Sequence, residues 1–589
     1  MKKKVPSKIE ISNLSTQYKK RNFILAEKLA MDMTKQFPDF LFGWRALGII
    51  LIKNKKFKEA IIVNKKIIDK SPEDHEAYFN IANCLREQGN FKQAEDYYKK
   101  TVSINPNYSL AFNNLGLTLK DQNKLSEAIE CFNKSILLDP RNYIAKNNLG
   151  QVLLEQGDFN KAEAYFEKAI LINPTYALAF NNLGLVLLKK KKFDIAEEYF
   201  RKALDLKQDF PEGWFNLGNV LNDKNYLYEA ENCFKKAINL RKNYTDALIN
   251  LGSVLHEQGK LDESEKIYKN LINLDNKNYN AQFNLSLIFN SKGNFKDGLK
   301  LYESRFHLKE NSIAKPRDKF LWDGNTSIKD KKFLIYEEQG LGDIIQFCRY
   351  LPLLEQKGAN IIFKVKQKMH HLLNSLDCKI NLTHKFTNED RIDFEAPLMS
   401  LPHLFDTKLN SIPSKSYYLR ADPQKITEWS KKLKSNNLKI GICWQGGKYK
   451  IDKGRSFSLE FFKKISKMQN IQLINLYKGD DEKKLLDIDF KITSFGDNFD
   501  NGKDAFVDTA AIMMSCDLII TCDTAIAHLA GALGRKVWVV LKYIPDWRWM
   551  LKRLDTPWYP SMHLYRQTEL NDWNGVFKKI TRDLQNFEK

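Results

Sequence analysis

The sequence predicts a chain of mixed α and α/β class, in which an α-helical solenoid is followed by two lobes built on parallel sheets. Two observations predict this organisation. A 34-residue period runs from Ser7 to Ser312 without an insertion, and self-similarity of this length is typical of stacked helical repeats. From about residue 313 the period stops, and short apolar runs alternate with helical stretches, the βαβ pattern of parallel sheets.

Length and composition fit several globular domains. A chain of 589 residues exceeds one domain, and its 43% hydrophobic and 12% aromatic content suffices for buried cores and excludes wholesale disorder. Lys and Arg exceed Asp and Glu by 94 to 72, which favours anionic partners. The lysines are interleaved with acidic residues, however, and no nucleic-acid-binding motif is present. We therefore expect no nucleic-acid partner.

The cysteines and the N-terminal residues indicate a compartment. The eight cysteines form no CxxC pair, which argues against a disulfide framework and against zinc. The basic start of the chain is followed by no apolar segment, and no stretch reaches the roughly 18–20 apolar residues that span a bilayer. The sequence thus predicts a cytoplasmic protein without a transmembrane segment and without a bound metal.

Small residues recur at two positions of the nine 34-residue units. Position 8 carries Gly48, Ala82, Gly116, Gly150, Gly184, Gly218, Gly252 and Ser286, and position 20 is Ala, Ser or Gly in every unit. Small residues there allow two helices of one unit to approach closely, and apolar residues at helical spacing supply the buried stripe. The pattern resembles the tetratricopeptide repeat (TPR), and residues 7–312 are assigned to such a solenoid. Leu14 at position 8 of the first unit fits a terminal cap.

An asparagine also keeps its register along the repeats. Its members are Asn80, Asn114, Asn148, Asn182, Asn216, Asn250 and Asn284. This register resembles the asparagine ladder by which TPR arrays hold extended peptides, since an amide both donates and accepts. The alternative is that the amides bridge neighbouring helices. The peptide-binding interpretation makes a protein or peptide the predicted partner.

The second half divides into a linker, residues 313–332, and two lobes, residues 333–430 and 431–589. Strands are expected at Phe333–Tyr336, Ile361–Val365, Asp393–Phe394, Tyr417–Arg420, Ile440–Trp444, Leu473–Leu476, Leu518–Cys522 and Val537–Leu541, and a final helix near Glu569–Phe587. Two such lobes would leave a ligand cleft at the carboxyl ends of their strands.

Four segments at the predicted strand ends carry candidate chemistry. They are a glycine turn with Gly340, Gly342 and Asp343; a basic turn with Trp444, Gln445, Gly446, Gly447, Lys453, Gly454, Arg455 and Ser456; the helix start Asp523, Thr524, Ala525 and His528; and the aromatic cluster Trp547, Trp549, Trp558 and Tyr559. Glycines allow positive φ and close backbone approach, and a helix N-terminus attracts anions. Each has a structural alternative: Asp343 as an N-cap, His528 as a packing residue, Arg455 as a surface charge, and the aromatic cluster as an anchor for the last helix.

Together these residues resemble the heptosyltransferase-like glycosyltransferases of family 9, which have the GT-B fold of two Rossmann-type lobes. The resemblance covers residues 333–568 and rests on GLGD at 340–343, GICWQGG at 441–447, RS at 455–456, VDTAAIM at 507–513, CDTAIAHLAGALG at 522–534 and PWYP at 557–560. It implies an inverting transfer from a nucleotide-diphosphate sugar, without a metal or another cofactor.

The resemblance also implies residue roles. Asp343 would be the general base that takes the proton of the acceptor hydroxyl. The donor would be held by Gln445, Gly446, Arg455, Ser456, Asp523, Thr524, Ala525 and His528. Arg455 stands where the family commonly has Lys.

Three functions follow as hypotheses. The leading one is a glycosyltransferase whose repeats recruit or present a protein acceptor. A second is a protein glycosylation activity like that of O-linked N-acetylglucosamine transferase, which shares the architecture but not the donor motifs found here. The third is a non-catalytic TPR scaffold with a vestigial transferase domain.

Overall fold

The computed structural model describes residues 5–308, 315–385, 391–446, 454–496, 499–501 and 503–587. The chain forms two compact units, Met1–Tyr244 and Thr245–Lys589. Of the basic turn, Gly447 and Lys453 lie outside the described residues.

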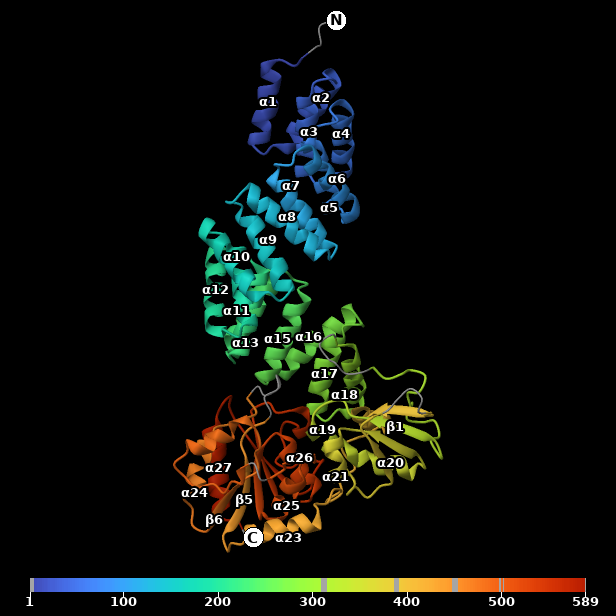
Figure 1. Cartoon of the computed structure of the whole chain (residues 1–589), viewed down its shortest axis with the longest axis vertical. Helices are drawn as coiled ribbons and strands as arrows, with labels where there is room; N and C mark the ends of the chain where they lie inside the picture. Colours follow the sequence, from blue (N-terminus) through green and yellow to red (C-terminus); the bar gives the residue numbers. More distant parts are fainter. Residues whose placement is uncertain are drawn as a thin grey trace. The chain divides into compact units, whose positions relative to one another are not determined.

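The first unit is a stack of helical hairpins that corresponds to repeats one to seven (Figure 1). Its helices are α1 (Lys8–Lys19), α2 (Phe23–Gln36), α3 (Leu41–Lys53), α4 (Phe57–Lys70), α5 (His75–Glu87), α6 (Phe91–Ile104), α7 (Ser109–Asp121), α8 (Leu125–Leu138), α9 (Tyr143–Glu155), α10 (Phe159–Ile172), α11 (Ala177–Lys189), α12 (Phe193–Leu206), α13 (Pro211–Asp223) and α14 (Leu227–Leu240). The predicted solenoid is confirmed for this unit.

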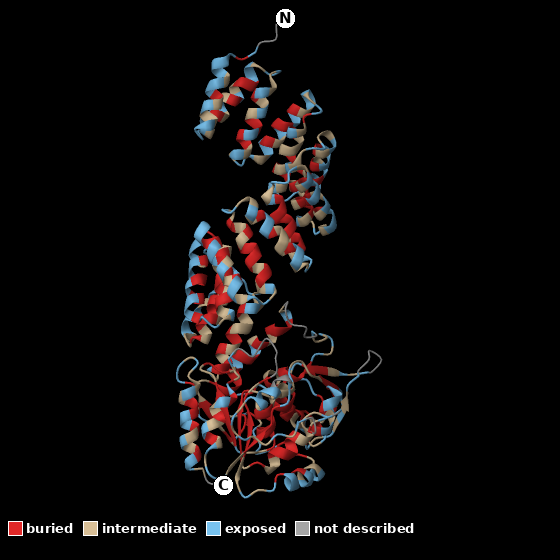
Figure 2. Ribbon diagram, turned by 60° about the vertical axis from the view of Figure 1, so that its left-hand side comes forward, coloured by how far each residue is buried: buried red, intermediate tan, exposed pale blue. Residues whose placement is uncertain are grey.

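The small residue at position 8 has a clear steric cause. A Cβ atom on Gly150 would lie 2.7 Å from Cε1 of Phe166, whose ring fills the space between α9 and α10. Gly184 meets Phe200 at the same distance. The ring of the second helix therefore takes the place of a side chain on the first. Figure 2 shows the resulting pattern, with buried residues on the facing sides of the helices and exposed residues on the outer sides.

The second unit begins with the last two repeats. They comprise α15 (Thr245–Glu257), α16 (Leu261–Leu274), α17 (Tyr279–Ser291), the shortened α18 (Phe295–Tyr302) and a 3₁₀ turn, η1 (Glu303–His307). Two parallel sheets follow them in the chain.

The first sheet has the strand order β3-β2-β1-β4 and is parallel throughout. Its strands are β1 (Lys332–Tyr336), β2 (Asn360–Lys364), β3 (Ile380–Thr383) and β4 (Phe394–Pro397). Helices α19 (Leu341–Phe347), α20 (Leu351–Gln356), α21 (His370–Leu373), α22 (Leu401–Leu404) and α23 (Pro423–Lys432) connect or follow them.

The second sheet has the order β6-β5-β7-β8-β9 and is also parallel. Its strands are β5 (Leu438–Cys443), β6 (Ile471–Asn475), β7 (Leu518–Cys522), β8 (Val537–Leu541) and β9 (Met562–Arg566), with helices α24 (Lys463–Ser466), α25 (Val507–Ser515), α26 (Ala525–Ala532) and α27 (Trp573–Gln585). Parallel sheets were expected, and both are present.

One predicted strand is wrong, and two strands were missed. Residues 417–420 are not a strand; the amides of Tyr418 and Leu419 instead donate to the carbonyl of Ala532, so the segment runs along the second lobe as a connection. The missed strands β3 and β9 are the edges of their sheets, where little apolar patterning is required. Among the helices of the described chain, none is long and apolar enough to cross a membrane.

Repeat nine shares its core with the two sheets. Phe295 lies 6.0 Å from Trp547 and 5.9 Å from Trp558 between ring centroids, and Tyr302 lies 6.1 Å from Trp547. The aromatic cluster thus packs against the last repeat. The alternative that it anchors the final helix is wrong, because α27 packs through Phe577 on Phe457, Phe461 and Phe462.

A buried ion pair joins the same elements. The Arg305 side chain is 0% exposed, and its Nε lies 2.9 Å from Oε1 of Glu338, which is also 0% exposed. Arg305 Nη2 donates to Oγ of Ser400 at 2.7 Å. A buried charge needs such partners, so the last repeat and the first lobe depend on each other.

We expect a fragment that begins at Thr245 to fold, and one that begins at residue 315 to be strongly destabilised. The shorter fragment loses the aromatic rings of repeat nine and leaves Glu338 buried without Arg305, which alone costs about 3–5 kcal/mol. Chemical denaturation followed by circular dichroism measures both. Equal unfolding midpoints for the two fragments would contradict the shared core.

Candidate functional site

The asparagine register forms bridges between neighbouring repeats. Nδ2 of Asn216 donates to Oδ1 of Asn181 at 2.9 Å, and Asn182 donates in the same way to Asn147 at 2.9 Å. Asn148 donates to Asn113 at 3.0 Å. These side chains are buried, so the helix-bridging alternative describes them. The bonds satisfy amides that would otherwise be costly to bury.

The remaining asparagines extend or flank this ladder. Nδ2 of Asn114 donates to Oδ1 of Asn83 at 2.9 Å, and Nδ2 of Asn80 lies 3.4 Å from Oδ1 of Asn64. Asn250 and Asn284 lie half-buried on α15 and α17 of the second unit.

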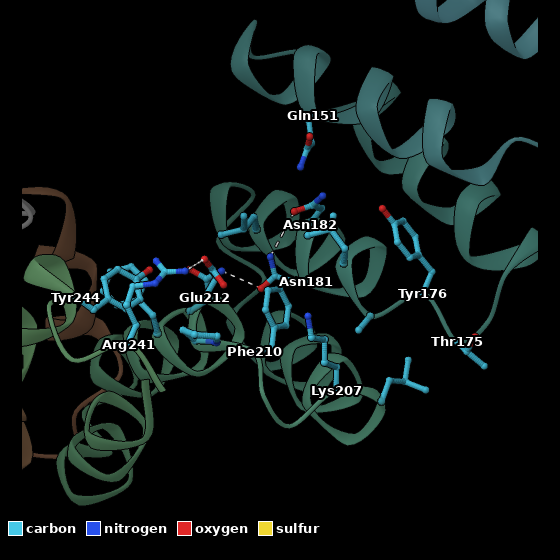
Figure 3. Close-up of a pocket in the computed structure, with 17 residues that line it drawn as sticks. Gln151, Thr175, Tyr176, Asn181, Asn182, Lys207, Phe210, Glu212, Arg241 and Tyr244 are labelled. Atoms are coloured by element: carbon cyan, nitrogen blue, oxygen red, sulfur yellow. Dashed lines mark hydrogen bonds and ion pairs between the residues drawn. The ribbon is translucent and has the colours of Figure 1, made fainter. Parts of the chain in front are cut away.

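A pocket of ≈ 970 Å³ opens beside this ladder in repeats five to seven (Figure 3). Asn181, Asn182 and Asn216 belong to its lining, so the ladder is also one wall of the pocket. Figure 3 shows Gln151 pointing its amide toward Asn182 from the preceding repeat. The register residues therefore line the groove while they bond to asparagines of the preceding repeat. Contacts to a ligand would then also involve other side chains of the lining.

Those other side chains are aromatic and charged. Tyr176, Phe210, Phe215 and Tyr244 line the pocket, and Arg241 pairs with Glu212 within it. Lys207 places its Nζ 5.5 Å from the Phe210 ring centroid. Aromatic walls with polar groups at their edges suit a peptide. The sequence analysis missed them, although aromatic residues at the last position of several repeats, such as Tyr176, Phe210 and Tyr244, were a usable signal.

In the second unit, the glycine turn and the second helix start come together. α19 follows β1 and α26 follows β7, and the first turns of these helices touch. A Cβ atom on Gly342 would lie 3.1 Å from Cδ2 of His528 and 3.3 Å from Cα of Ala525. Close approach therefore explains Gly342. Neither Gly340 nor Gly342 adopts a positive φ, so of the two uses of glycine named above only close approach applies here.

Asp343 has two protein partners at this junction. Its Oδ2 accepts the amide of Gly340 at 3.0 Å. Gly340 is the N-cap of α19 and Asp343 is the third residue of the helix, so Asp343 supports the cap and is not the N-cap that the alternative named. Its Oδ1 accepts Nη2 of Arg548 at 2.7 Å. Burial raises the pKa of Asp343, and the Arg548 guanidinium opposes this rise. The side chain remains 20% exposed, so a ligand can still reach the carboxylate.

Arg548 joins the two lobes. Its Nη1 donates to Oδ1 of Asp546 at 2.8 Å while Nη2 holds Asp343, and its side chain is only 8% exposed. It lies on a 3₁₀ turn, η8 (Trp547–Trp549). The tryptophans of this turn were among the residues predicted from the sequence, and the arginine between them was not. We call Asp343, Asp523, His528, Asp546 and Arg548 the inter-lobe cluster.

Asp523 and His528 are the buried members of the cluster. Burial raises the pKa of Asp523 to about 6, and the neighbouring Asp546 carboxylate adds to the rise. Burial lowers the pKa of His528 to about 3, so this imidazole is neutral at ordinary pH. Its Nδ1 lies 3.0 Å from the Tyr559 hydroxyl, and its ring stacks on Trp549 at 5.2 Å. The packing role of His528 is thus present in the structure.

Of the other predicted donor residues, Arg455, Thr524 and Ala525 lie close to this cluster. The positive charge of Arg455 is near enough to lower the pKa of Asp343 and of Asp523, although burial dominates both. The amide of Gly446 donates to Oγ of Ser456 at 3.1 Å. Thr524 caps α26 by accepting the amide of Ile526, and Ala525 is the first residue of that helix.

The chemistry available here is acid–base and anion binding. A carboxylate of raised pKa stands beside two arginines and the N-terminus of α26, whose dipole favours negative charge. In the described part of the chain, no three His, Cys, Asp or Glu side chains gather as a metal site.

Replacing Asn182 by Leu should destabilise the first unit by about 1–3 kcal/mol, because Oδ1 of Asn147 and Nδ2 of Asn181 lose their partner. Urea denaturation measures this, with the exposed Asn160→Leu as matched control. Unchanged stability would mean that the amide faces a ligand instead.

Replacing Asp523 by Asn should stabilise the second unit near neutral pH by up to about 3 kcal/mol. Folded Asp523 keeps its proton to about pH 6, above its ordinary value of 3.8, so the wild-type protein loses stability as pH rises between these values. The gain should vanish near pH 4, as thermal unfolding across pH will show. The acid sensitivity from His528 is common to both proteins and cancels; a pH-independent difference would refute the assignment.

Comparison with known proteins identifies the repeats. Residues 75–108, 109–142, 143–209, 211–244 and 245–278 match the tetratricopeptide repeat family. Protein FlbA of Caulobacter vibrioides is 26% identical over 297 residues, 45% of this chain and 48% of that protein. The chain thus spans about half of this relative's length.

Several solved structures resemble part of the chain. PilF of Pseudomonas aeruginosa has a TM-score of 0.33 at 24% identity and covers 35% of this chain and 95% of its own. YrrB, described as a TPR protein with an unusual peptide-binding site, has a TM-score of 0.26 at 23% identity over 31% of this chain and 95% of its own. The family matches and the helices of the structure together show a tetratricopeptide-repeat solenoid, followed by a region of parallel sheets.

Proposed function

We propose that the two lobes form a GT-B-like glycosyltransferase that moves a sugar from a nucleotide-diphosphate sugar to an acceptor hydroxyl. The observation that carries this proposal is the position of Asp343: an accessible carboxylate of raised pKa, set where the first turns of α19 and α26 meet. The motif resemblance of residues 333–568 supports the same reaction class.

In this reaction the acceptor oxygen attacks the anomeric carbon, and Asp343 takes the hydroxyl proton. The bond between that carbon and the phosphate oxygen breaks, and its electron pair leaves with the nucleoside diphosphate. Attack opposite to the leaving group inverts the anomeric configuration. The negative charge that develops is stabilised by Arg455, Arg548 and the N-terminus of α26.

The Asp343–Arg548 ion pair has a role in this proposed reaction. Arg548 stabilises the ionised carboxylate before the donor binds, because it opposes the effect of burial on the pKa. A bound diphosphate offers Arg548 a second anionic partner. The pair thereby links occupation of the donor site to the state of the base.

The repeats supply the acceptor in this proposal. The pocket of repeats five to seven combines aromatic walls with amides, which suits an extended peptide. A protein acceptor would be bound there and modified at a hydroxyl side chain. Transfer to a protein would be shared with O-linked N-acetylglucosamine transferase. The preferred nucleotide-sugar donor distinguishes that activity from a family 9-like transferase.

One observation favours the scaffold alternative: both carboxylate oxygens of Asp343 already have protein partners. A vestigial site of this kind would bind no nucleotide, and the repeats alone would carry the function. The experiment below decides between them.

Asp343→Asn should retain donor binding within a few-fold and reduce transfer by about 100-fold or more, because an amide cannot accept the proton. Calorimetry against UDP-N-acetylglucosamine, ADP-heptose and free nucleoside diphosphates measures binding, and release of nucleoside diphosphate measures turnover. The exposed Asp330→Asn serves as the matched control.

Two results would overturn the transferase reading. Either no nucleotide diphosphate or nucleotide sugar binds the wild-type chain, or Asp343→Asn turns over as fast as Asp330→Asn. The first result would favour the scaffold.

A further inference from the structure

A second pocket lies in the second lobe, away from the inter-lobe cluster. Its volume is ≈ 430 Å³, and it is bounded by β9, the turn before it and α27. The lining includes Lys552, Arg553, Arg566, Gln567, Lys579 and Arg582. It shares no lining residue with the inter-lobe cluster, and no motif of the sequence analysis used it.

The charge of this pocket is unbalanced. Five cationic side chains line it, against the single carboxylate of Asp583. That carboxylate is already engaged, since Oδ2 accepts the Tyr565 hydroxyl at 2.9 Å and Oδ1 accepts Nε of Arg582 at 2.9 Å. Arg553 is paired outside the pocket with Asp555. In the described structure, Lys552, Lys579 and Arg566 have no carboxylate partner.

The guanidinium of Arg566 has no anionic partner in the described structure. Its guanidinium contacts carbonyl oxygens only: those of Trp549 and Met550 at 3.1 and 2.9 Å, and that of Arg553 at 3.1 Å. Its Nε has no partner among the described residues. Burial lowers the pKa of Arg566 to about 10, because no anion offsets the loss of hydration. An anion in the pocket would offset this positive charge.

Gln567 is a buried polar residue of the lining. The residue is 4% exposed, and its Oε1 accepts the amides of Tyr543 and Asn571 at 3.0 and 3.2 Å. Its Nε2 is buried without a partner in the described structure. Within the lining, the buried side-chain atoms that lack a partner are Nε of Arg566 and Nε2 of Gln567. Both atoms are donors that lie under the surface of the pocket wall, so they add no negative charge that would offset the cations of the lining.

We propose that this pocket binds a small phosphate-bearing molecule, at a site distinct from the inter-lobe cluster. Guanidinium groups match the geometry of phosphate oxygens, and ammonium groups from Lys552 and Lys579 add charge at the rim. The enclosed volume fits a phosphomonoester or a diphosphate better than an extended polyanion. The ligand is a free small molecule and not a lipid surface.

Calorimetry of the full chain with inorganic phosphate and with pyrophosphate tests this. Lys579→Ala should weaken binding by about tenfold, because one charge-assisted contact is lost. Lys578→Ala is the matched control, since this exposed lysine is its neighbour on α27 but does not line the pocket. It should bind like the wild type.

Gln567→Glu is a second test variant, chosen because it should remain folded. A carboxylate oxygen can still accept the amides of Tyr543 and Asn571, while the carboxylate adds a negative charge to the lining of the pocket, which opposes anion binding. This variant should remain folded and lose anion binding by more than about tenfold. Dependence of the binding on Lys579, which is no member of the inter-lobe cluster, separates the site from the proposed donor site.

Three results would overturn the proposal. They are absence of saturable binding to the wild type, equal weakening by Lys578→Ala and Lys579→Ala, or binding that Gln567→Glu leaves unchanged. Sedimentation with vesicles of phosphatidylcholine and phosphatidylglycerol in equal parts forms the second arm. If the chain binds vesicles in a Lys579-dependent way but binds neither free phosphate nor pyrophosphate, the ligand is a lipid headgroup. That result would refute the proposal of a small-molecule ligand.

Discussion

The junction of the two lobes depends on one buried cation. Arg548 donates to Asp343 from the first lobe and to Asp546 from its own turn, and its side chain is 8% exposed. Removal of either carboxylate would leave this buried guanidinium with one anionic partner in place of two, which is destabilising. The geometry of Asp343 is therefore fixed by a residue 205 positions away in the sequence. The candidate base is held by tertiary structure as well as by its own helix.

The turn that carries Arg548 also connects the repeats to this junction. Trp547 packs on Phe295 and Tyr302 of repeat nine, and Trp549 stacks on His528 of α26. Alternation of tryptophan and charged residues lets one short turn contact the apolar core and the polar site at once. Repeat nine is consequently part of the core of the lobes. In the proposed function, presentation of an acceptor would therefore belong to the earlier repeats, which carry the larger pocket.

Periodicity explains what the sequence could predict about the fold. A 34-residue repeat directly predicts pairs of helices. The contact of Gly150 with Phe166 shows why the residue at position 8 of each unit is small. Central strands such as β7 are buried on both faces and read as continuous apolar runs. Edge strands lack that requirement, so β3 and β9 gave little signal. The apolar residues of 417–420 looked like a strand because Tyr418 and Leu419 are buried, although their amides bond to a helix end.

The residues of the candidate site likewise differ in how far the sequence could predict them. Asp343 and Asp523 stand in local motifs at strand ends, and such positions can be found without a structure. Arg548 has no local signature, since only folding brings it to Asp343. Periodicity likewise could not decide whether Asn182 bridges helices or faces a ligand, because both uses require the same register.

If a diphosphate is the ligand of the lobes, it must compete with Asp343 for Arg548. The more it draws Arg548 away, the further the pKa of Asp343 rises toward the value that burial alone imposes. A base that becomes stronger only when the leaving group is in place would limit wasteful proton transfer, and the buried arginine is the group that makes such coupling possible.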